Sequence, residues 1–264
     1  MTRKEMNAER ARKWLAQIED NKAWSRAIRY SIANTIVRKG TLVEDNERHY
    51  MSIKSYDKSL SNIELTSETT YDAANRLVDN GALVGILNFA SYFNPGGGFL
   101  KGAGAQEESL CHVSGLFPIL YSLFCYGERR ADTSIPTTYY DEVIYSKNVP
   151  FTSHEGDITP PNLIDVISVA APNCNRVPMT KMDKYEDALR KRIEAIVILP
   201  FLNGCDTLIL GAWGCGVFKN DPKIVSKVFK ETLLKYGKAY NNIIFALPNE
   251  KVRLIFEEEF KSEE

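Results

Sequence analysis

The sequence predicts a three-layer α/β fold, with a mixed central sheet flanked by helices and an additional N-terminal helical extension. Two patterns lead to this prediction. Short runs of mostly β-branched or aliphatic residues, bounded by turn residues, are typical of buried strands. They alternate with segments whose apolar residues recur at helical spacing. The predicted strands are Leu83–Phe89, Val166–Ala170, Thr207–Leu210 and Ile243–Leu247.

The first 62 residues precede this alternation. Between Arg3 and Ile36, apolar residues recur every three or four positions, which predicts helix. The next stretch, Lys39–Ser61, is polar and contains tyrosines, without a clear period. We therefore expect a single-domain chain, in which a helical extension at residues 1–62 packs on a core at residues 63–264.

Caps as well as apolar spacing mark the helices of the core. One helix begins near Thr69, and a second spans Met182–Ile196. A third spans Asp221–Tyr236, whose first residue is the expected N-cap and is followed by Pro222 at the first helical position. The span Gly127–Pro161 is predicted to hold an edge strand and surface loops.

Composition narrows the function classes. Lys and Arg total 33 against 34 for Asp and Glu, so the net charge is −1 and no basic field holds nucleic acid non-specifically. No apolar stretch is long enough to span a membrane, and the charged N-terminus has no apolar h-region, so we expect no secretory signal. Five cysteines without a CxxC pair and three separated histidines argue against a disulfide framework and a structural zinc site, and leave a metal held by scattered oxygen ligands open. We expect a monomer in the cytoplasm (nucleocytoplasmic in a eukaryote), with no membrane, metal or cofactor.

A glycine-rich loop follows the first predicted strand. Five of the 16 glycines fall between Gly96 and Gly104. A strand, a glycine-rich loop and a helix start together make a place where backbone N–H groups can hold a phosphate. The spacing matches neither GxGxxG nor the Walker A pattern. A mobile surface loop is the alternative interpretation.

A second glycine-rich loop has the same context. The predicted strand Thr207–Leu210 runs into Gly211–Pro222, which opens the last predicted helix of the core. Open α/β sheets bind ligands at the carboxyl ends of their strands. Two such loops could therefore close on one diphosphate.

Glu107 and Glu108 follow the first loop as adjacent carboxylates. On a helix they point about 100° apart, so they do not form a symmetric catalytic pair. One could face a ligand as a general acid while the other supports it. Alternatively, both could stabilise a helix N-terminus.

At these residues the sequence resembles the microbial-type poly(ADP-ribose) glycohydrolases, which have a macrodomain-like fold. The resemblance rests on a GGG triplet, a short spacer and QEE, and it extends over most of the chain from Thr69 to Phe260. The supporting motifs are YDAANRL (Tyr71–Leu77), VIYS (Val143–Ser146), DVISVAAPN (Asp165–Asn173) and GAWGCGVFKNDP (Gly211–Pro222).

The resemblance implies a role for each matched residue. Glu108 matches the catalytic acid, and Glu107 matches the neighbouring acid that helps hold the bound ribose. The implied ADP-ribose-binding residues are Asn94, Gly96, Gly97, Gly98, Gln106, Gly214, Cys215, Gly216, Val217 and Phe218. Gly96–Gly98 and Gly214–Gly216 match the two diphosphate loops. Asn94 and Phe218 match residues beside the distal ribose.

The implied activity is hydrolysis of the O-glycosidic ribose–ribose bond of poly(ADP-ribose), with ADP-ribose carried on protein or nucleic acid as the partner. Two alternatives share the same pocket: a hydrolase for ADP-ribosylated nucleic acid or mono-ADP-ribosylated protein, and a module that binds ADP-ribose without cleaving it. One departure from the family concerns His112, where members usually carry a basic residue. We expect this histidine on the outer face of the helix, with a contact to the substrate channel as the alternative.

Overall fold

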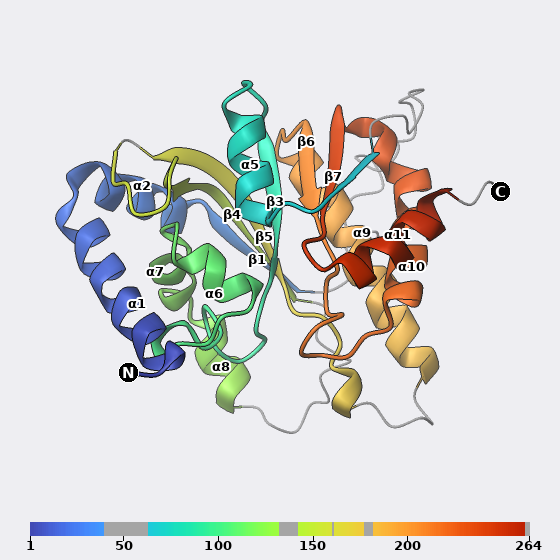
Figure 1. Ribbon diagram of the computed structural model, residues 1–264, viewed down its shortest axis with the longest axis horizontal. Coiled ribbons are helices and arrows are strands. Elements are labelled where there is room, and N and C mark those ends of the chain that lie inside the picture. Colours follow the sequence, from blue (N-terminus) through green and yellow to red (C-terminus); the bar gives the residue numbers. More distant parts are fainter. Residues whose placement is uncertain (40–62, 132–141, 160, 177–181, 262–264) are drawn as a thin grey trace. The chain divides into compact units, whose positions relative to one another are not determined.

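The computed structural model describes residues 1–39, 63–131, 142–159, 161–176 and 182–261 (Figure 1). Within them, seven strands form one mixed sheet in the order β1-β4-β5-β3-β6-β7-β2. The strands are β1 (Thr35–Lys39), β2 (Ile63–Thr66), β3 (Val84–Phe89), β4 (Glu142–Phe151), β5 (Asn162–Val169), β6 (Thr207–Leu210) and β7 (Asn242–Ala246). The predicted α/β class, with its mixed sheet and N-terminal helices, is confirmed.

The chain divides into two compact units. The first comprises residues 1–37, 88–134 and 144–170, and the second comprises 38–87, 135–143 and 171–264. The first unit contains α1 (Arg3–Asp20), α2 (Lys22–Ala33), the short 3-10 helix η1 (Phe99–Lys101), α6 (Gln106–Cys111), α7 (Leu116–Tyr121) and α8 (Cys125–Ala131). The second contains α5 (Thr70–Val78), η2 (Cys174–Arg176), α9 (Met182–Leu202), α10 (Pro222–Tyr236), η4 (Gly237–Ala239) and α11 (Glu250–Lys261).

The N-terminal segment is not one continuous helix. Asn21 ends α1 and caps α2, because its Oδ1 accepts from the N–H groups of Ala23 at 3.0 Å and Trp24 at 3.3 Å. The chain then leaves the helix and forms β1, which the prediction of helix through Ile36 missed. The β-branched residues of Thr-Ile-Val favour this strand. The polar connection predicted at Lys39–Ser61 lies, beyond its first residue, outside the described residues.

The edge strand predicted within Gly127–Pro161 is an interior strand. It is β4, which lies between β1 and β5 in the sheet. The hydroxyl of Tyr145 on β4 donates to Asp165 Oδ2 on β5 at 2.5 Å, and the N–H of Asn148 donates to Asp165 Oδ1 at 2.8 Å. The prediction was wrong because β1, which covers the outer side of β4, was itself read as helix.

Strands of the second unit match the prediction more closely. β2, β7, β6 and β3 are parallel neighbours, with Ile63 beside Ile243, Ile243 beside Leu208, and Leu208 beside Gly85. The four residues of β6 are all buried, as expected for a strand covered on both faces. Because β3 and β6 are parallel, their carboxyl ends lie at the same edge of the sheet. β2 was not predicted.

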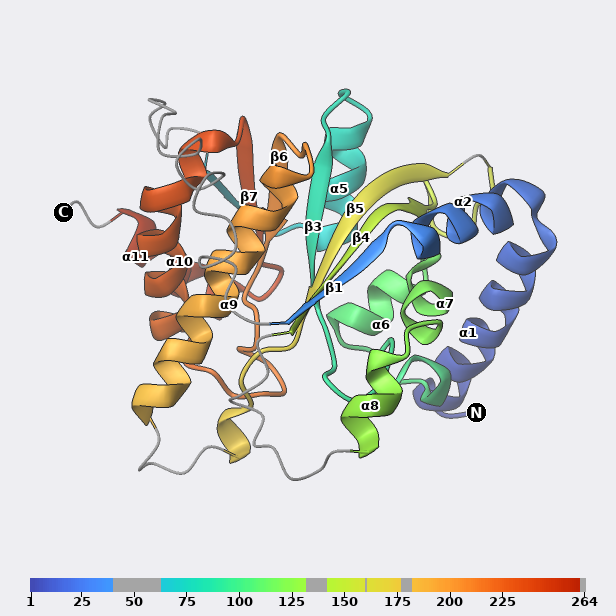
Figure 2. The same ribbon diagram turned by 180° about the vertical axis from the view of Figure 1, so that it is seen from behind.

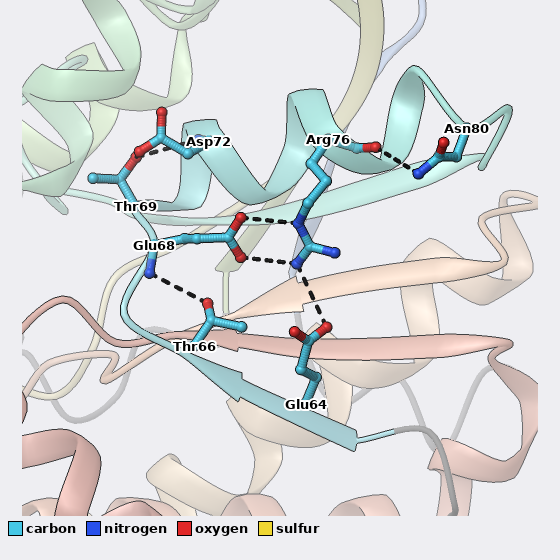
Figure 3. Close-up of polar contacts among 7 residues, drawn as sticks. All are labelled: Glu64, Thr66, Glu68, Thr69, Asp72, Arg76 and Asn80. Atoms are coloured by element: carbon cyan, nitrogen blue, oxygen red, sulfur yellow. Dashed lines mark hydrogen bonds and ion pairs between the residues drawn. The ribbon is translucent and has the colours of Figure 1, made fainter.

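The helices of the second unit begin where the caps predict. Thr69 caps α5, with its Oγ1 accepting from the N–H of Asp72 at 3.2 Å, and Asp221 caps α10. Figure 3 shows Arg76 of α5 reaching the carboxylates of Glu68, at 2.8–2.9 Å, and Glu64 of β2, at 3.4 Å. This pairing lies near the surface, so it contributes roughly 1 kcal/mol or less and mainly orients the helix.

Helix α9 extends beyond the predicted Met182–Ile196 to Leu202, because its last turns remain buried. It packs against α10, which also packs against α11, and Figure 2 shows these helices together. Within the described ranges, no helix combines the length and apolar character needed to cross a membrane.

Candidate active site

The first glycine-rich loop connects β3 to α6 and belongs to the first unit. Its three consecutive glycines all donate their N–H groups, one within the loop and two to side chains at the start of α6. Gly97 N–H donates to the carbonyl of Asn94 at 2.9 Å, Gly98 N–H donates to Glu108 Oε1 at 2.7 Å, and Gly96 N–H donates to Glu107. The N–H groups of the three glycines are therefore already used by the loop and by α6.

The three side chains of Gln106, Glu107 and Glu108 anchor this loop at successive points. Gln106 Oε1 accepts from the N–H of Phe89 at 2.9 Å, at the end of β3. Glu107 Oε2 accepts from the N–H of Ser91 at 2.7 Å. Glu108 accepts at both oxygens, as described below. Consecutive residues at the start of α6 thus bind the beginning, middle and end of the segment 89–105.

Glu107 is a buried carboxyl group. Its residue is 3% exposed, and Oε1 also accepts from Asn88 Nδ2 at 3.3 Å. Burial raises the pKa of Glu107 to about 8, although the N–H donors around it favour the charged form. Among the described residues, Asn88 Oδ1 has no hydrogen-bond partner. A protonated Glu107 can donate to this amide oxygen after a flip of the amide, which agrees with the direction of the pKa shift.

This raised pKa predicts a loss of stability as pH rises. The folded-state pKa of about 8 lies above the ordinary 4.5, so folding takes up a proton between these values. The resulting stabilisation is complete below pH 4.5 and is lost as pH rises toward 8. We expect the free energy of unfolding of the parent to fall by roughly 2–4 kcal/mol relative to Glu107→Gln between pH 5 and pH 8.

Urea denaturation at both pH values measures this difference. Glu258→Gln is the matched control, because Glu258 is exposed on α11 and should leave the pH dependence unchanged. Parallel stability curves for the parent and Glu107→Gln would show that Glu107 is ionised in the folded chain throughout.

Glu108 lies at the third position of α6 and is 6% exposed. Its Oε1 accepts from Gly98 N–H at 2.7 Å, and its Oε2 accepts from Ala105 N–H at 2.9 Å. Gly97, with φ +61°, lies against both acids: a Cβ there would overlap with Glu108 Oε1 and lie 3.0 Å from Glu107 Oε2. Glycine at this position therefore allows the two carboxyl groups to approach the loop backbone.

His112 is buried, so the prediction of an outward-facing side chain is wrong. Its ring lies edge-on to Phe99 of η1, with centroids 4.7 Å apart, and only 8% of the residue is exposed. Burial, with a smaller effect from Arg10, lowers the pKa of His112 to about 4, so the ring is neutral at physiological pH. The apolar spacing of the helix gave no sign that this face is covered by η1.

The second glycine-rich loop connects β6 to α10 and belongs to the second unit. Asn220, which is 2% exposed, closes it: its Nδ2 donates to the carbonyls of Pro172 and Gly214, each at 2.9 Å. Tyr185 of α9 donates to Asn220 Oδ1 at 2.7 Å. Gly214 has φ +76°, and a Cβ there would lie 2.5 Å from Asn220 Nδ2 and 2.6 Å from Ala171 Cβ. A buried amide therefore ties this loop to the chain segments at Pro172 and Tyr185.

Donors remain available in this second loop. Within the described part of the chain, the N–H groups of Gly216, Val217 and Phe218 have no acceptor. Gly216 and Val217 are exposed, and Phe218 is half-buried. Cys215 is more enclosed, and burial raises the pKa of its thiol to about 12, so it remains a thiol. Three successive free N–H groups can bind an anion.

Sequence reasoning missed the polar residues that shape both loops, namely Asn88, Ser91, Tyr185 and Asn220. Asn88 gave one signal, because an amide at the end of an apolar strand needs a buried partner. Of the residues singled out from the sequence, the structure brings Gln106, Glu107, Glu108 and the GGG triplet together in the first unit. The residues Gly214, Cys215, Gly216, Val217 and Phe218 lie together in the second. In the described ranges, no group of three His, Cys, Asp or Glu side chains is arranged to hold a metal ion.

Comparison with known proteins adds a family match. The model of the microbial-type poly(ADP-ribose) glycohydrolase (PARG) catalytic domain matches residues 8–154. The chain is similar to PARG from Deinococcus radiodurans in complex with ADP-ribose, with 32% identity and a TM-score of 0.77 over 89% of this chain and 97% of that one. It is similar to PARG from Thermomonospora curvata, with 27% identity and a TM-score of 0.85 over 97% of this chain and 100% of that one.

A third structure, the Thermomonospora curvata enzyme bound to the inhibitor ADP-HPD, matches with 27% identity and a TM-score of 0.81 over 97% of this chain and 100% of that one. A comparison with curated protein sequences finds no match.

Proposed function

This chain belongs to the microbial-type PARG family, and we propose that it releases ADP-ribose by hydrolysing the ribose–ribose bond of poly(ADP-ribose), with Glu108 as general acid and base. The chain is accordingly a glycosidase-type hydrolase. The observation that carries the role of Glu108 is its carboxyl group, which is buried and held at both oxygens by the glycine-rich loop. A group fixed in this way is positioned for proton transfer.

The proposed mechanism uses one acid. Glu108 protonates the oxygen of the leaving ribose as the glycosidic bond breaks and an oxocarbenium-like cation develops at the anomeric carbon. The carboxylate that results then takes a proton from the attacking water. The usual two-carboxylate arrangement, with one acid on each side of the sugar, does not apply, since Glu107 and Glu108 lie on the same side of Gly97 and Glu107 is held by Asn88 and Ser91. The diphosphate of the substrate stabilises the developing cation.

The binding residues divide by what they offer. The free N–H groups of Gly216, Val217 and Phe218 bind the diphosphate, and Gly214 and Cys215 shape the turn that presents them. The N–H groups of Gly96–Gly98 are used within their own loop, so these glycines contribute a backbone that a ligand can approach closely. The ribose is bound beside the first loop. Gln106 and Glu107 hold this loop in place, and Asn94 is exposed on it, where it can contact the ribose.

Phe218 gives a prediction that separates ligand contact from core packing. If its half-buried ring positions the distal ribose, Phe218→Ala should lower kcat about 10-fold or more with little change in Tm. A core role predicts instead a loss of roughly 3–5 kcal/mol in stability and normal turnover of the folded fraction. Phe124→Ala is the matched control, since Phe124 is 92% exposed. Normal turnover by a strongly destabilised Phe218→Ala protein would contradict the ligand contact.

The proposed function also implies which molecules this chain acts on and where in the cell it acts. Related PARG structures contain ADP-ribose and ADP-HPD. We propose that this chain, as a monomer, acts on ADP-ribose carried by protein or nucleic acid and needs no cofactor, with residues 63–264 as the catalytic core and 1–62 as an extension packed on it. All five cysteines have free thiols, which fits a cytoplasmic or nucleocytoplasmic location.

Incubation with three substrates tests the proposed function. Automodified poly(ADP-ribose) chains, mono-ADP-ribosylated protein and ADP-ribosylated DNA are compared by the ADP-ribose that each releases. We expect release chiefly from poly(ADP-ribose). Release from one of the other two substrates alone would identify a different linkage, and binding of ADP-ribose with no release from any substrate would identify a module that binds without cleaving.

A further inference from the structure

Helix α1 lies directly against the loop between η1 and α6, within the first unit (Figure 1). Gly102, with φ +76°, is the point of contact: a Cβ there would overlap with the backbone oxygen of Lys4 and lie 2.8 Å from its carbonyl carbon. Asn7 Nδ2 donates to the carbonyl of Gly102 at 3.4 Å and lies 3.6 Å from the position of a Cβ on Gly104. The backbone of α1 and the backbone of the loop therefore touch without a side chain between them.

The position of α1 is itself well fixed. Thr2 and Glu5 form a capping box, with Thr2 N–H donating to Glu5 Oε2 at 2.7 Å and Glu5 N–H donating to Thr2 Oγ1 at 3.2 Å. Further along the helix, Trp14 Nε1 donates to the carbonyl of Ser114 at 3.0 Å, and its ring packs edge-on against Trp24. The capping box fixes the first turn of α1, and Trp14 holds the helix against Ser114 and Trp24, so α1 can act as a rigid support.

The supported loop leads directly to the acid. The carbonyl of Gly98 accepts from the N–H groups of Lys101 at 2.9 Å and Ala103 at 3.1 Å, which closes the loop into compact turns. The two N–H groups that hold Glu108 belong to Gly98 and Ala105, on either side of Gly102. A displacement of Gly102 is therefore transmitted to both donors of the Glu108 carboxyl group.

We propose that α1 is a positioning element for catalysis: the Lys4 carbonyl and the Asn7 side chain hold Gly102, and the loop thereby holds Glu108 in its reactive orientation. Gly102 and Asn7 are positioning residues, since they act through the loop. This inference rests on the proposed role of Glu108.

Two glycines with similar positive φ angles allow a matched test. Gly102→Ala adds a Cβ that displaces α1, whereas Gly81→Ala adds one at φ +82° with nothing within 4 Å. Both variants carry the backbone strain of a positive φ. Gly102→Ala should lose further stability because its Cβ also displaces α1. We expect kcat on poly(ADP-ribose) to fall about 10- to 100-fold in Gly102→Ala, with KM within about 3-fold, because a small misplacement of a catalytic group has effects of this size. Gly81→Ala should retain the parent kcat.

Two further measurements test whether α1 affects catalysis through Glu108. If α1 acts through Glu108, Gly102→Ala should have no additional effect on kcat in the Glu108→Gln background. Amide exchange of Gly98 and Ala105 should also be faster in Gly102→Ala and unchanged in Gly81→Ala. Asn7→Ala should lower kcat and speed amide exchange by smaller factors. This variant replaces Gly102→Ala in the test if Gly102→Ala fails to fold.

The proposal is overturned if Gly102→Ala and Gly81→Ala have the same kcat, if the loss persists fully in the Glu108→Gln background, or if the exchange rates do not change. An inactive parent would contradict the proposed function alone, because amide exchange still tests the support of the loop by α1.

Discussion

Glu108→Gln is expected to lower kcat on poly(ADP-ribose) at least 10²-fold, the scale of lost general acid catalysis, while ADP-ribose binds within a few-fold of the parent. Glutamine preserves the size of the side chain and removes the transferable proton. Turnover and calorimetric affinity for ADP-ribose measure the two effects separately. A variant that remains active would end the assignment of Glu108 as the acid.

Glu108→Gln also changes the hydrogen bonds between this side chain and the loop. The parent carboxyl group accepts from Gly98 N–H and from Ala105 N–H, whereas a glutamine amide offers one oxygen and places its NH₂ group against the other donor.

We expect Glu108→Gln to lose roughly 1–3 kcal/mol of stability through this mismatched donor. Turnover is therefore compared per folded protein. A drop in turnover that only follows the loss of folded protein would mean that Glu108 acts by capping α6 and holding the loop, without donating a proton.

Gly97→Ala is expected to reduce turnover at least 10²-fold, since a Cβ at this position displaces both carboxyl groups together. It would overlap with Glu108 Oε1 and lie 3.0 Å from Glu107 Oε2. The positive φ adds a separate strain of roughly 1–3 kcal/mol. Steady-state turnover and Tm separate the displacement of the acids from this general loss of stability.

Gly156→Ala is the control for the strain, because Gly156 has φ +84° and no atom within 4 Å of an added Cβ. It should lose comparable stability and retain full turnover. If Gly97→Ala also retains turnover within a few-fold, the carboxyl groups do not depend on this glycine for their position.

The parts of the fold that the sequence predicts are those with a local signal. β6 and the start of α10 follow from an apolar run and from Asp221 with Pro222. The break between α1 and α2 was not predicted, because the apolar spacing continues through Asn21. Only the hydrogen bonds that the Asn21 side chain accepts show that it caps α2. β4 was placed at an edge because the strand beyond it, β1, follows a helix directly and has only five residues.

In the candidate site, too, the sequence predicts the features that have a local signal and misses those that depend on the three-dimensional structure. The GGG and QEE residues are evident as a cluster in the sequence, and the angle between adjacent helical residues predicts that Glu107 and Glu108 diverge. Which N–H groups are used and which are free is a property of the three-dimensional loop. The glycines 96–98 use their donors internally, whereas Gly216, Val217 and Phe218 keep theirs. Asn220, which sets the second loop, has partners 6 and 48 residues away.

The role of Glu108 as proton donor is tested most directly by changing the leaving group. Poly(ADP-ribose) loses a sugar hydroxyl, which needs a proton, whereas an ADP-ribose that carries p-nitrophenol at the anomeric carbon loses a phenolate, which needs none. We expect Glu108→Gln to slow hydrolysis of poly(ADP-ribose) at least 10²-fold and hydrolysis of the nitrophenyl substrate less than about 10-fold. Equal losses on both substrates would contradict proton donation by Glu108.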